Sequence, residues 1–262
     1  MTRQNFYKTR TKRQIQALDE RLIKRLVLDE RASQPRLGGR KLLKILGPKL
    51  KDCGIDIGRD RFFKTLKRQR LLVEKLPPSH RTTNSYHNLP IFLNKVKDKE
   101  LTQPNQAWAA DITYLRKRDT FMYLSLITDM YSRKIVGYHL GASLATEETL
   151  KALKMALRNK PKEAQPIHHS DRGCQYCSHE YVRELELNGL VVSMTEQNHC
   201  AENALAERVN GILKQEYGLG YRFNSAQQMH KAVKQAVWLY NTKRPHSSLD
   251  LETPDHIHQM AA

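Results

Sequence analysis

The chain has 262 residues, of which 39% are hydrophobic, and its formal net charge is +18. This length and composition allow one large domain or two small ones with a buried core. No run of about 18 apolar residues is present to span a membrane, and no apolar stretch follows the basic residues 1–10, so we expect no secretory signal peptide. Four cysteines without such a signal indicate a reducing cytosol, and the expected location is cytoplasmic.

The positive charge is concentrated in the first part of the chain. Residues 1–105 contain 26 Lys/Arg and 10 Asp/Glu, whereas residues 106–262 contain 19 and 17. This asymmetry predicts that the first part binds a polyanion. A membrane surface would also attract it, but the basic residues do not lie opposite a clean apolar helical face with Trp or Phe anchors. Nucleic acid is therefore the expected partner, and a membrane is not.

Residues 1–76 are predicted to form a small all-helical domain. Apolar residues recur at helical spacing over 1–32, 40–50 and 59–70, with Gly47-Pro48 expected to kink the second helix. A helix, a short turn and a basic helix are the plan of a helix-turn-helix DNA-binding module. The alternative is a solvated, charged helix in a small bundle. The candidate DNA-binding residues of the third helix are Arg59, Arg61, Lys64, Lys67 and Arg68.

Residues 77–104 are rich in Pro, Asn and Ser and are predicted to be a linker that lies along the next domain. Residues 105–262 are predicted to form an α/β domain, because three consecutive strands are followed by alternating helices and strands. The expected strands are 107–115, 120–128, 133–140, 166–170 and 190–194, and the expected helices are 146–159, 179–188, one around Glu207, and 225–241.

Three acidic residues in this second domain are candidates for metal ligands. Asp111 lies in an alternating, strand-like segment, Asp171 follows the short apolar run 166–169, and Glu207 lies in a helical pattern 36 positions after Asp171. Carboxylates on a strand, a strand end and a helix can converge on one point. Hard Mg²⁺ or Mn²⁺ ions prefer such oxygen ligands and leave room for phosphate oxygens and water. Spacing alone is weak evidence, because a chain with 27 acids contains many such pairs.

The sequence motifs around these three acids resemble those of a known family. W-x-x-D-I-T at Asp111, H-H-S-D-R-G at Asp171 and E-N-A-x-x-E ending at Glu207 resemble the DDE integrase core, and most closely the OrfB-type transposases of bacterial insertion sequences, which are relatives of retroviral integrases. The resemblance implies an RNase H-like fold with a mixed five-stranded sheet flanked by helices. It also implies that these three residues are catalytic and hold two Mg²⁺ or Mn²⁺ ions. Double-stranded DNA would be the substrate, OrfA a frameshift fusion or partner, and the active form a homo-oligomer on DNA in a bacterial cell.

Further residues are candidates for DNA contacts or for other roles. Asn203, Glu207, Asn210 and Lys214 form a polar stripe on one helix, and the candidate DNA contacts outside the first domain are Lys214, Arg208, Arg244 and His246. Asp129 is interpreted as structural, because strand-end turns often use an aspartate.

A zinc site is the alternative for the cysteines. Cys174 and Cys177 together with His199-Cys200 offer formally acceptable ligands, although small buried side chains are the preferred interpretation. Two other functions stay open beside a transposase. One is a nuclease of the same fold that only hydrolyses DNA, and the other is a non-catalytic DNA-binding regulator derived from a transposase.

Overall fold

The computed structural model describes residues 3–74, 89–196 and 203–260, and the chain divides into two compact units, residues 1–76 and 77–262. The first unit contains three helices, α1 (Arg3–Ser33), α2 (Gly39–Asp52) and α3 (Arg59–Arg68). Their apolar sides enclose one core, to which α1 contributes Ile23 and Val27. Gly39 begins α2 against the ring of Phe63, where a Cβ atom would come within 2.8 Å of the ring. The predicted helical domain is thus present, and α2 continues through Pro48.

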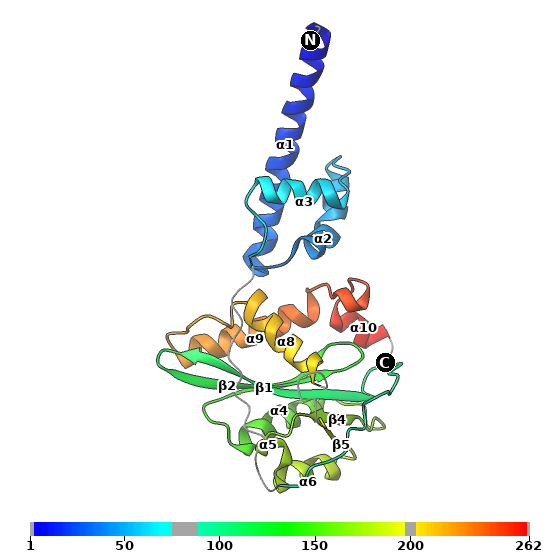
Figure 1. Ribbon diagram of the computed structural model, residues 1–262, viewed down its shortest axis with the longest axis vertical. Coiled ribbons are helices and arrows are strands. Elements are labelled where there is room, and N and C mark those ends of the chain that lie inside the picture. The colour runs from blue at the N-terminus through cyan, green and yellow to red at the C-terminus, as the bar shows by residue number, and fades with distance from the viewer. Residues whose placement is uncertain (1–2, 75–88, 197–202, 261–262) are drawn as a thin grey trace. The chain divides into compact units, whose positions relative to one another are not determined.

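The second unit is built on a mixed sheet of five strands in the order β3-β2-β1-β4-β5 (Figure 1). β1 pairs antiparallel with β2, which pairs antiparallel with β3, while β1 and β4 and then β4 and β5 are parallel. The strands are β1 (Ala107–Lys117), β2 (Thr120–Asp129), β3 (Ile135–Gly141), β4 (Ile167–Ser170) and β5 (Val191–Met194). The prediction of a mixed five-stranded sheet flanked by helices is confirmed.

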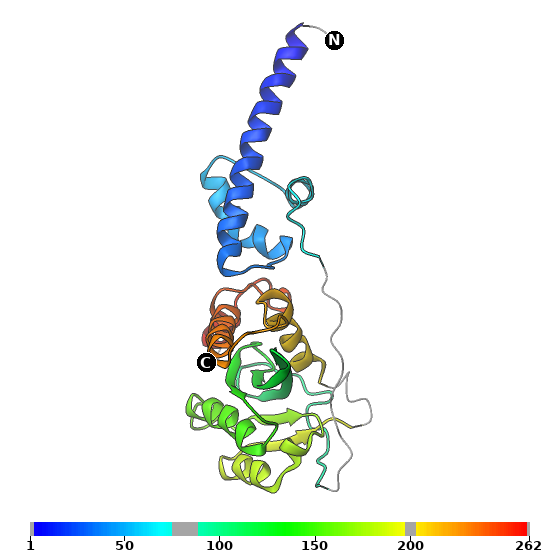
Figure 2. The same cartoon turned by 90° about the vertical axis from the view of Figure 1, so that its left-hand side faces the viewer.

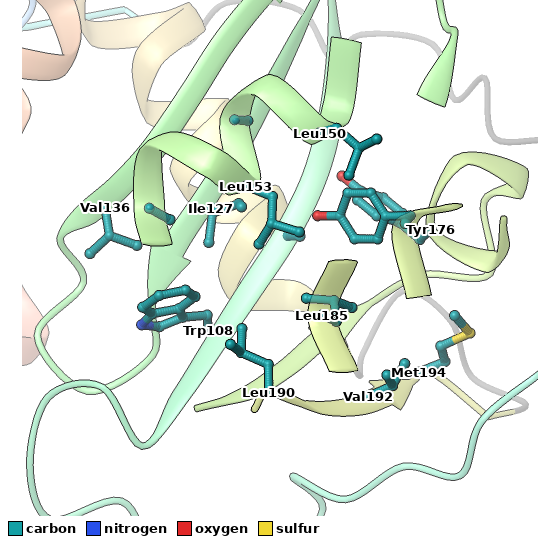
Figure 3. Close-up of a cluster of buried hydrophobic side chains, with 14 of the residues drawn as sticks. Trp108, Ile127, Val136, Leu150, Leu153, Tyr176, Leu185, Leu190, Val192 and Met194 are labelled. Carbon is teal, nitrogen blue, oxygen red and sulfur yellow. The ribbon is translucent and has the colours of Figure 1, made fainter. Parts of the chain in front are cut away.

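Helices cover both faces of this sheet (Figures 1 and 2). One face packs against α4 (Thr146–Arg158), α5 (Cys174–Cys177) and α6 (His179–Leu187), and the other packs against α8 (Ala204–Glu216) and α9 (Ala226–Thr242). Figure 3 shows the first of these two cores, in which Trp108 of β1 and Leu153 of α4 are fully buried. Alternation along β1 sends Trp108 and Ala110 to this core and Leu115 to the core under α8 and α9. The two faces of β1 therefore have different neighbours.

The segment 89–104, predicted as part of a linker, lies against the second unit. Leu89 and Phe92 pack on the core under α4–α6, and the Lys95 backbone N–H donates a hydrogen bond of 2.8 Å to Ser193 Oγ. The rest of the predicted linker, up to residue 88, lies outside the described residues.

Two short helices after α9 were not predicted from the sequence. They are the 3₁₀ helix η1 (Ser247–Leu249) and α10 (Pro254–Met260). The Thr253 hydroxyl accepts a hydrogen bond from the His256 backbone N–H, and Pro254 occupies the first turn, where a missing N–H costs nothing. The Thr253-Pro254 pair is therefore a sequence signal from which the start of α10 could have been predicted. Within the described ranges, no helix is both long and apolar enough to cross a membrane.

Candidate active site

Strand register places Asp111 beside Asp171. The parallel pairing of β1 with β4 ends at Ala110 opposite Ser170, so each aspartate is the next residue after the last pair. Successive residues of a strand alternate between faces, and the two aspartates therefore continue their strands in the same phase. Two acids that are 60 positions apart in the sequence meet because one strand ends where its neighbour continues.

The pKa of the Asp111 carboxyl group is strongly shifted by the groups around it. Burial, the negative charge of Asp171 and, to a smaller extent, that of Glu207 together raise the pKa of this carboxyl from 3.8 to about 7. A hydrogen bond of 2.7 Å from Asn210 Nδ2 to Asp111 Oδ2 acts in the opposite direction, because it stabilises the carboxylate. Asp111 thus senses the charges of both other predicted ligands, and near neutral pH it is poised between its two protonation states.

Asp171 is held by the turn that leads into α5. Its Oδ1 accepts a hydrogen bond of 3.0 Å from the Gly173 backbone N–H. A Cβ atom at Gly173 would lie only 3.0 Å from that same Oδ1. The neighbouring Arg172 points elsewhere, with its Nε donating to the Thr195 carbonyl at 2.8 Å. Glycine after Asp-Arg therefore leaves room for the aspartate side chain.

Glu207 is in the first turn of α8, and its side chain is exposed. The helix start is tied to β1 by Asn203, whose Nδ2 donates a hydrogen bond of 3.2 Å to the Ala110 carbonyl. Asn210, one turn after Glu207, makes the second tie through Asp111. The predicted polar stripe of α8 therefore faces β1 at the aspartate. Sequence reasoning placed Asn210 on this stripe but missed its role, which the offset of one helical turn from Glu207 could have suggested.

The residues present fit a hard divalent cation. The donors are carboxylates, and the like charges of Asp111 and Asp171 oppose each other's ionisation, a penalty that a cation removes. Asn210 Oδ1 is buried and has no hydrogen-bond partner within the described residues. In the same part of the chain, no three His, Cys, Asp or Glu side chains already stand together as one ion's ligands. The structure thus couples Asp111 electrically to both other acids without gathering all three into a closed ligand set.

Two of the predicted DNA contacts on α8 differ in position. Lys214 is half-buried, and burial lowers its pKa while the nearby Asp111 carboxylate raises it. It thus faces the acidic site, two turns beyond Glu207. Arg208 is exposed on the same helix.

The prediction that Arg244 contacts DNA is wrong for this structure. The side chain is 2% exposed. Its Nε and Nη2 donate to the two carboxylate oxygens of Glu216 at 2.8 and 2.9 Å, and its guanidinium lies 5.7 Å from the ring centre of Tyr240. Arg244 therefore joins the end of α9 to the end of α8. His246 follows it, with its ring 6.2 Å from that of Tyr240 and its Nδ1 3.0 Å from Ser248 Oγ.

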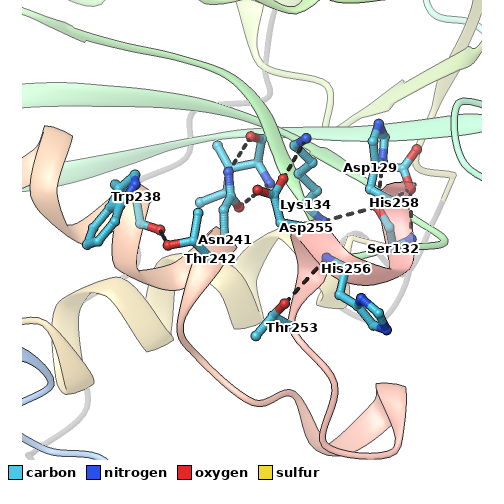
Figure 4. Close-up of polar contacts among 11 residues, drawn as sticks. Asp129, Ser132, Lys134, Trp238, Asn241, Thr242, Thr253, Asp255, His256 and His258 are labelled. Atoms are coloured by element: carbon cyan, nitrogen blue, oxygen red, sulfur yellow. Dashed lines mark hydrogen bonds and ion pairs between the residues drawn. The ribbon is translucent and has the colours of Figure 1, made fainter. Parts of the chain in front are cut away.

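The structural interpretation of Asp129 is confirmed. Its fully buried carboxylate accepts hydrogen bonds from the Asn105 N–H, the Ser132 N–H and the Ser132 hydroxyl, at 2.7 to 2.8 Å. Figure 4 shows the same serine reaching His258 of α10, with Oγ and Nδ1 2.9 Å apart. Asp129 thus fixes the turn after β2 and, through Ser132, the C-terminal helix.

The cysteines are divided between surface and core. Cys174 is exposed, and Cys177 is buried with its Sγ 3.6 Å from the sulfur of Met194. Burial raises the pKa of the Cys177 thiol to about 11, which disfavours the thiolate that a zinc ion requires. The other residues of the zinc alternative, His199 and Cys200, lie outside the described residues.

The basic residues of α3 belong to the first unit, where two of them pair with α1. Arg61 Nη2 lies 3.0 Å from Asp19, and Arg68 Nη2 lies 2.6 Å from Glu20. These arginine side chains are about half exposed, and such surface pairs contribute little, roughly 0–1 kcal/mol. Arg59 pairs with its neighbour Asp60 at 3.0 Å, whereas Lys64 and Lys67 are exposed on the same helix.

Comparison with known proteins identifies the family. Integrase core domain models match residues 102–200 and 188–254. The chain is 38% identical over 250 residues to the insertion element IS600 uncharacterized 31 kDa protein of Shigella sonnei, which covers 93% of this chain and 90% of that protein. It is 34% identical over 185 residues to transposase InsF for insertion sequence IS3A of Escherichia coli (strain K12), covering 70% of this chain and 64% of InsF.

The fold also matches a chain in the cryoEM structure of the simian T-cell lymphotropic virus intasome in complex with PP2A regulatory subunit B56 gamma. The TM-score is 0.53 and the identity 19%, covering 84% of this chain and 74% of that chain. The second unit is thus an integrase core with an RNase H-like fold. The chain belongs to the insertion-sequence transposases of the DDE integrase superfamily, which are polynucleotidyl transferases. Integrase-core proteins are metal-dependent, and transposases bind DNA.

Proposed function

We propose that Asp111, Asp171 and Glu207 are the catalytic carboxylates with which this transposase cleaves DNA strands and joins a 3′-hydroxyl end to a new phosphodiester. The observation that carries the proposal is the geometry: strand register brings the first two acids together, and two asparagine side chains of α8 hold the helix of the third against β1. The raised pKa of Asp111 agrees with this arrangement.

These carboxylates would hold two Mg²⁺ or Mn²⁺ ions, which when bound supply positive charge for the attacking and leaving oxygens of phosphoryl transfer. Around neutral pH, Asp111 must give up a proton before it can act as a ligand, because its pKa is about 7. Asn210 holds the Asp111 carboxylate in place while leaving its own Oδ1 unused by the described residues. Lys214 lies on the same side of α8, where its ammonium would bind a DNA phosphate.

The domains divide the work in this proposal. Residues 1–76 would bind duplex DNA through a helix-turn-helix-like surface that includes Arg59, Arg61, Lys64, Lys67 and Arg68. Residues 77–104 would connect them to the catalytic core, residues 105–262. The active form would be a homo-oligomer on the element ends, together with OrfA as a partner or as a frameshift fusion, in the bacterial cytoplasm.

The test is a joining assay with the full chain and a labelled duplex that ends in a pre-cut 3′-hydroxyl. Mg²⁺ or Mn²⁺ should yield joined product, and EDTA should abolish it. A nuclease that only hydrolyses would give shortened strands without joined product, and a non-catalytic regulator would give neither. Joining that persists at full rate in EDTA would overturn the carboxylate site. Because an OrfA partner is part of the proposal, the assay is run with the chain alone and with an OrfA–OrfB fusion.

A further inference from the structure

The outer end of the β1–β2 hairpin carries a compact aromatic and basic cluster. Tyr114 and Arg116 of β1 stand opposite Tyr123 and Phe121 of β2. The ring centres of Tyr114 and Tyr123 are 5.0 Å apart, and those of Tyr114 and Phe121 are 6.1 Å apart. The Arg116 guanidinium lies 5.9 Å from the ring centre of Phe121. We call these four residues the hairpin cluster.

The hairpin cluster continues a face of the sheet past the helices that cover it. By strand alternation it shares the face of Trp108 and Ala110, which α4–α6 bury. Along this face, Glu148 of α4 reaches β3 at His139 and at Gly141, the partner of Tyr123 in β2. Phe121 lies two residues further out along β2. Phe121 is 42% exposed.

Hairpin stability alone does not account for this composition. Edge-to-face aromatic pairs across two strands do stabilise a hairpin, and the Tyr114–Tyr123 pair already provides this stabilisation. Phe121 at the tip is exposed, with the Arg116 guanidinium over its ring, and its apolar surface stays in contact with water, which is unfavourable. Exposed aromatic rings interleaved with basic residues are the composition of surfaces on which unpaired nucleotides stack.

The charge around the hairpin cluster is positive, which also favours binding of a nucleic-acid strand. Arg116, Lys117 and Arg118 follow one another at the tip. The acid of the turn, Asp119, is paired with Arg222 at 2.8 Å. Backbone hydrogen bonds of 3.0 Å join Phe223 to Arg116 and Arg118, so the tip is anchored to the segment between α8 and α9. A nucleic-acid strand would thus meet a fixed, positively charged tip.

The hairpin cluster is also within reach of the proposed active site. Arg116 is five residues beyond Asp111 on β1, a path of about 17 Å at the usual rise of a strand. Asp111 points to the face under α8, and the hairpin cluster lies on the other face. The pairing of β4 with β1 ends at Ala110, so β4 does not extend along β1 between Asp111 and the hairpin cluster.

We propose that the hairpin cluster is a stacking platform for unpaired DNA nucleotides that lie within a few residues of the reacting phosphodiester. Phe121 and the tyrosines take the base faces, and Arg116 takes a phosphate or a base face. Because stacking is tolerant of sequence, the platform selects single-stranded character and not a particular base. The location next to the reaction rests on the proposed function, but the preference for unpaired DNA does not.

The experiment compares binding of the full chain to a blunt duplex and to the same duplex with a short single-stranded overhang. The variants are Phe121→Leu, which keeps the apolar size without the ring, Arg116→Gln and Phe121→Trp. Trp238→Leu is the matched control, because Trp238 (Figure 4) is 54% exposed on α9, a helix that covers the other face of the sheet. We expect Phe121→Leu to weaken overhang binding about tenfold, the size of one lost base stack, and to leave blunt-duplex binding unchanged. Phe121→Trp and Trp238→Leu should retain the wild-type preference.

A second measurement on the unaltered protein does not depend on folding of the variants. A photoreactive base in the overhang should cross-link to a peptide that contains residues 114–123. Wild-type overhang affinity in both Phe121→Leu and Arg116→Gln, or equal weakening of both DNAs, or cross-links confined to other peptides, would overturn the platform. If the unaltered chain keeps its overhang preference but joins no DNA in any form of the joining assay, the proposed function fails while the platform stands.

Discussion

The two units of this transposase use charge in opposite ways. Residues 1–76 contain 22 Lys/Arg and 8 Asp/Glu, and residues 77–262 contain 23 and 19. In the first unit basic side chains such as Lys64 and Lys67 lie exposed outside an apolar core, and the ion pairs of Arg61 and Arg68 with α1 are at the surface. In the second unit individual charges are buried, as in Asp129 and Arg244, or half-buried, as in Asp111 and Lys214.

Because of this difference, the charges of the first unit are suited to attracting a polyanion, whereas those of the second unit are suited to taking part in a reaction. Exposed charges are screened by salt and act additively, so their number decides how strongly a polyanion is drawn in. A charge removed from water acts strongly on its neighbours, and its exact partners decide what it does. The raised pKa of Asp111 and the bidentate pair of Arg244 belong to the second kind. The following predictions test the contrast.

The largest effect is expected from a glycine in the tightly packed core. A Cβ atom at Gly137 of β3 would lie 2.3 Å from the Ala152 carbonyl oxygen and 2.9 Å from the Ala156 Cβ atom. Gly137→Ala must push α4 off the sheet, and we expect it to lower the free energy of unfolding by about 3 kcal/mol or more. Urea unfolding followed by tryptophan fluorescence measures this unit, because both tryptophans, Trp108 and Trp238, belong to it. A decrease in the free energy of unfolding of less than about 1 kcal/mol would contradict tight packing of α4 on β3.

The next effect concerns the basic unit. A fragment of residues 1–76 should bind duplex DNA, and its affinity should fall about 100-fold between 50 and 200 mM salt, as expected for roughly four phosphate contacts. Lys64→Ala and Lys67→Ala should each weaken binding to all sequences alike and reduce the salt slope by about 1. Fluorescence anisotropy at several salt concentrations checks both statements. A flat salt response would exclude the phosphate contacts.

A buried histidine gives the core unit a dependence on pH. Burial lowers the pKa of His168 to about 3, and its Nε2 is 3.0 Å from the Tyr181 hydroxyl. Below pH 6.5 the unfolded chain binds a proton at His168 that the folded chain does not, so the contribution of this residue to stability falls as the pH drops. At pH 5 its contribution is about 2 kcal/mol less favourable than at pH 8. The raised pKa of Asp111 acts with the opposite sign and is common to the wild type and His168→Gln. Unfolding measured at both pH values should therefore show that lowering the pH from 8 to 5 changes the stability of the wild type less favourably than that of His168→Gln, by about 2 kcal/mol. The same pH dependence in both proteins would contradict the assignment to His168.

The smallest effect is expected from the same kind of substitution in the first unit. Gly47 lies inside α2, and a Cβ atom there would meet nothing within 4 Å. Gly47→Ala should therefore stabilise a 1–76 fragment by about 0.5–1 kcal/mol through helix propensity. Thermal unfolding followed by circular dichroism measures it. Destabilisation would mean that α2 is packed more tightly than its surface indicates.

Periodicity in the sequence predicted the elements that depend on local pattern. The long strands β1 and β2 and the amphipathic helices α4 and α9 were found because their burial alternates or recurs with the period of the element. The polar stripe of α8 was predicted for the same reason. Short elements such as α5 carry too few residues for a period, and the strand order became a prediction only through the family resemblance.

What the sequence could not supply was the partner of each charged group. Arg244 was predicted to contact DNA as part of a segment that resembles the end of the family's core, and it pairs instead with Glu216 beside the ring of Tyr240. Asp111 and Asp171 could be suspected as a pair, but the register that brings them together depends on β4 ending at Ser170. Asn210 became a partner of Asp111 only once α8 was placed against β1.

The most direct test of the division between binding and chemistry removes one ligand charge at a time. Asp111→Asn, Asp171→Asn and Glu207→Gln change side-chain size very little, and each protein is measured for duplex binding and for Mg²⁺-dependent joining in the same preparation. We predict that joining falls at least about 100-fold, roughly 2.7 kcal/mol of barrier, while binding stays within about twofold. A variant that keeps more than about a tenth of the wild-type joining rate, or that loses binding in proportion to joining, would contradict this account.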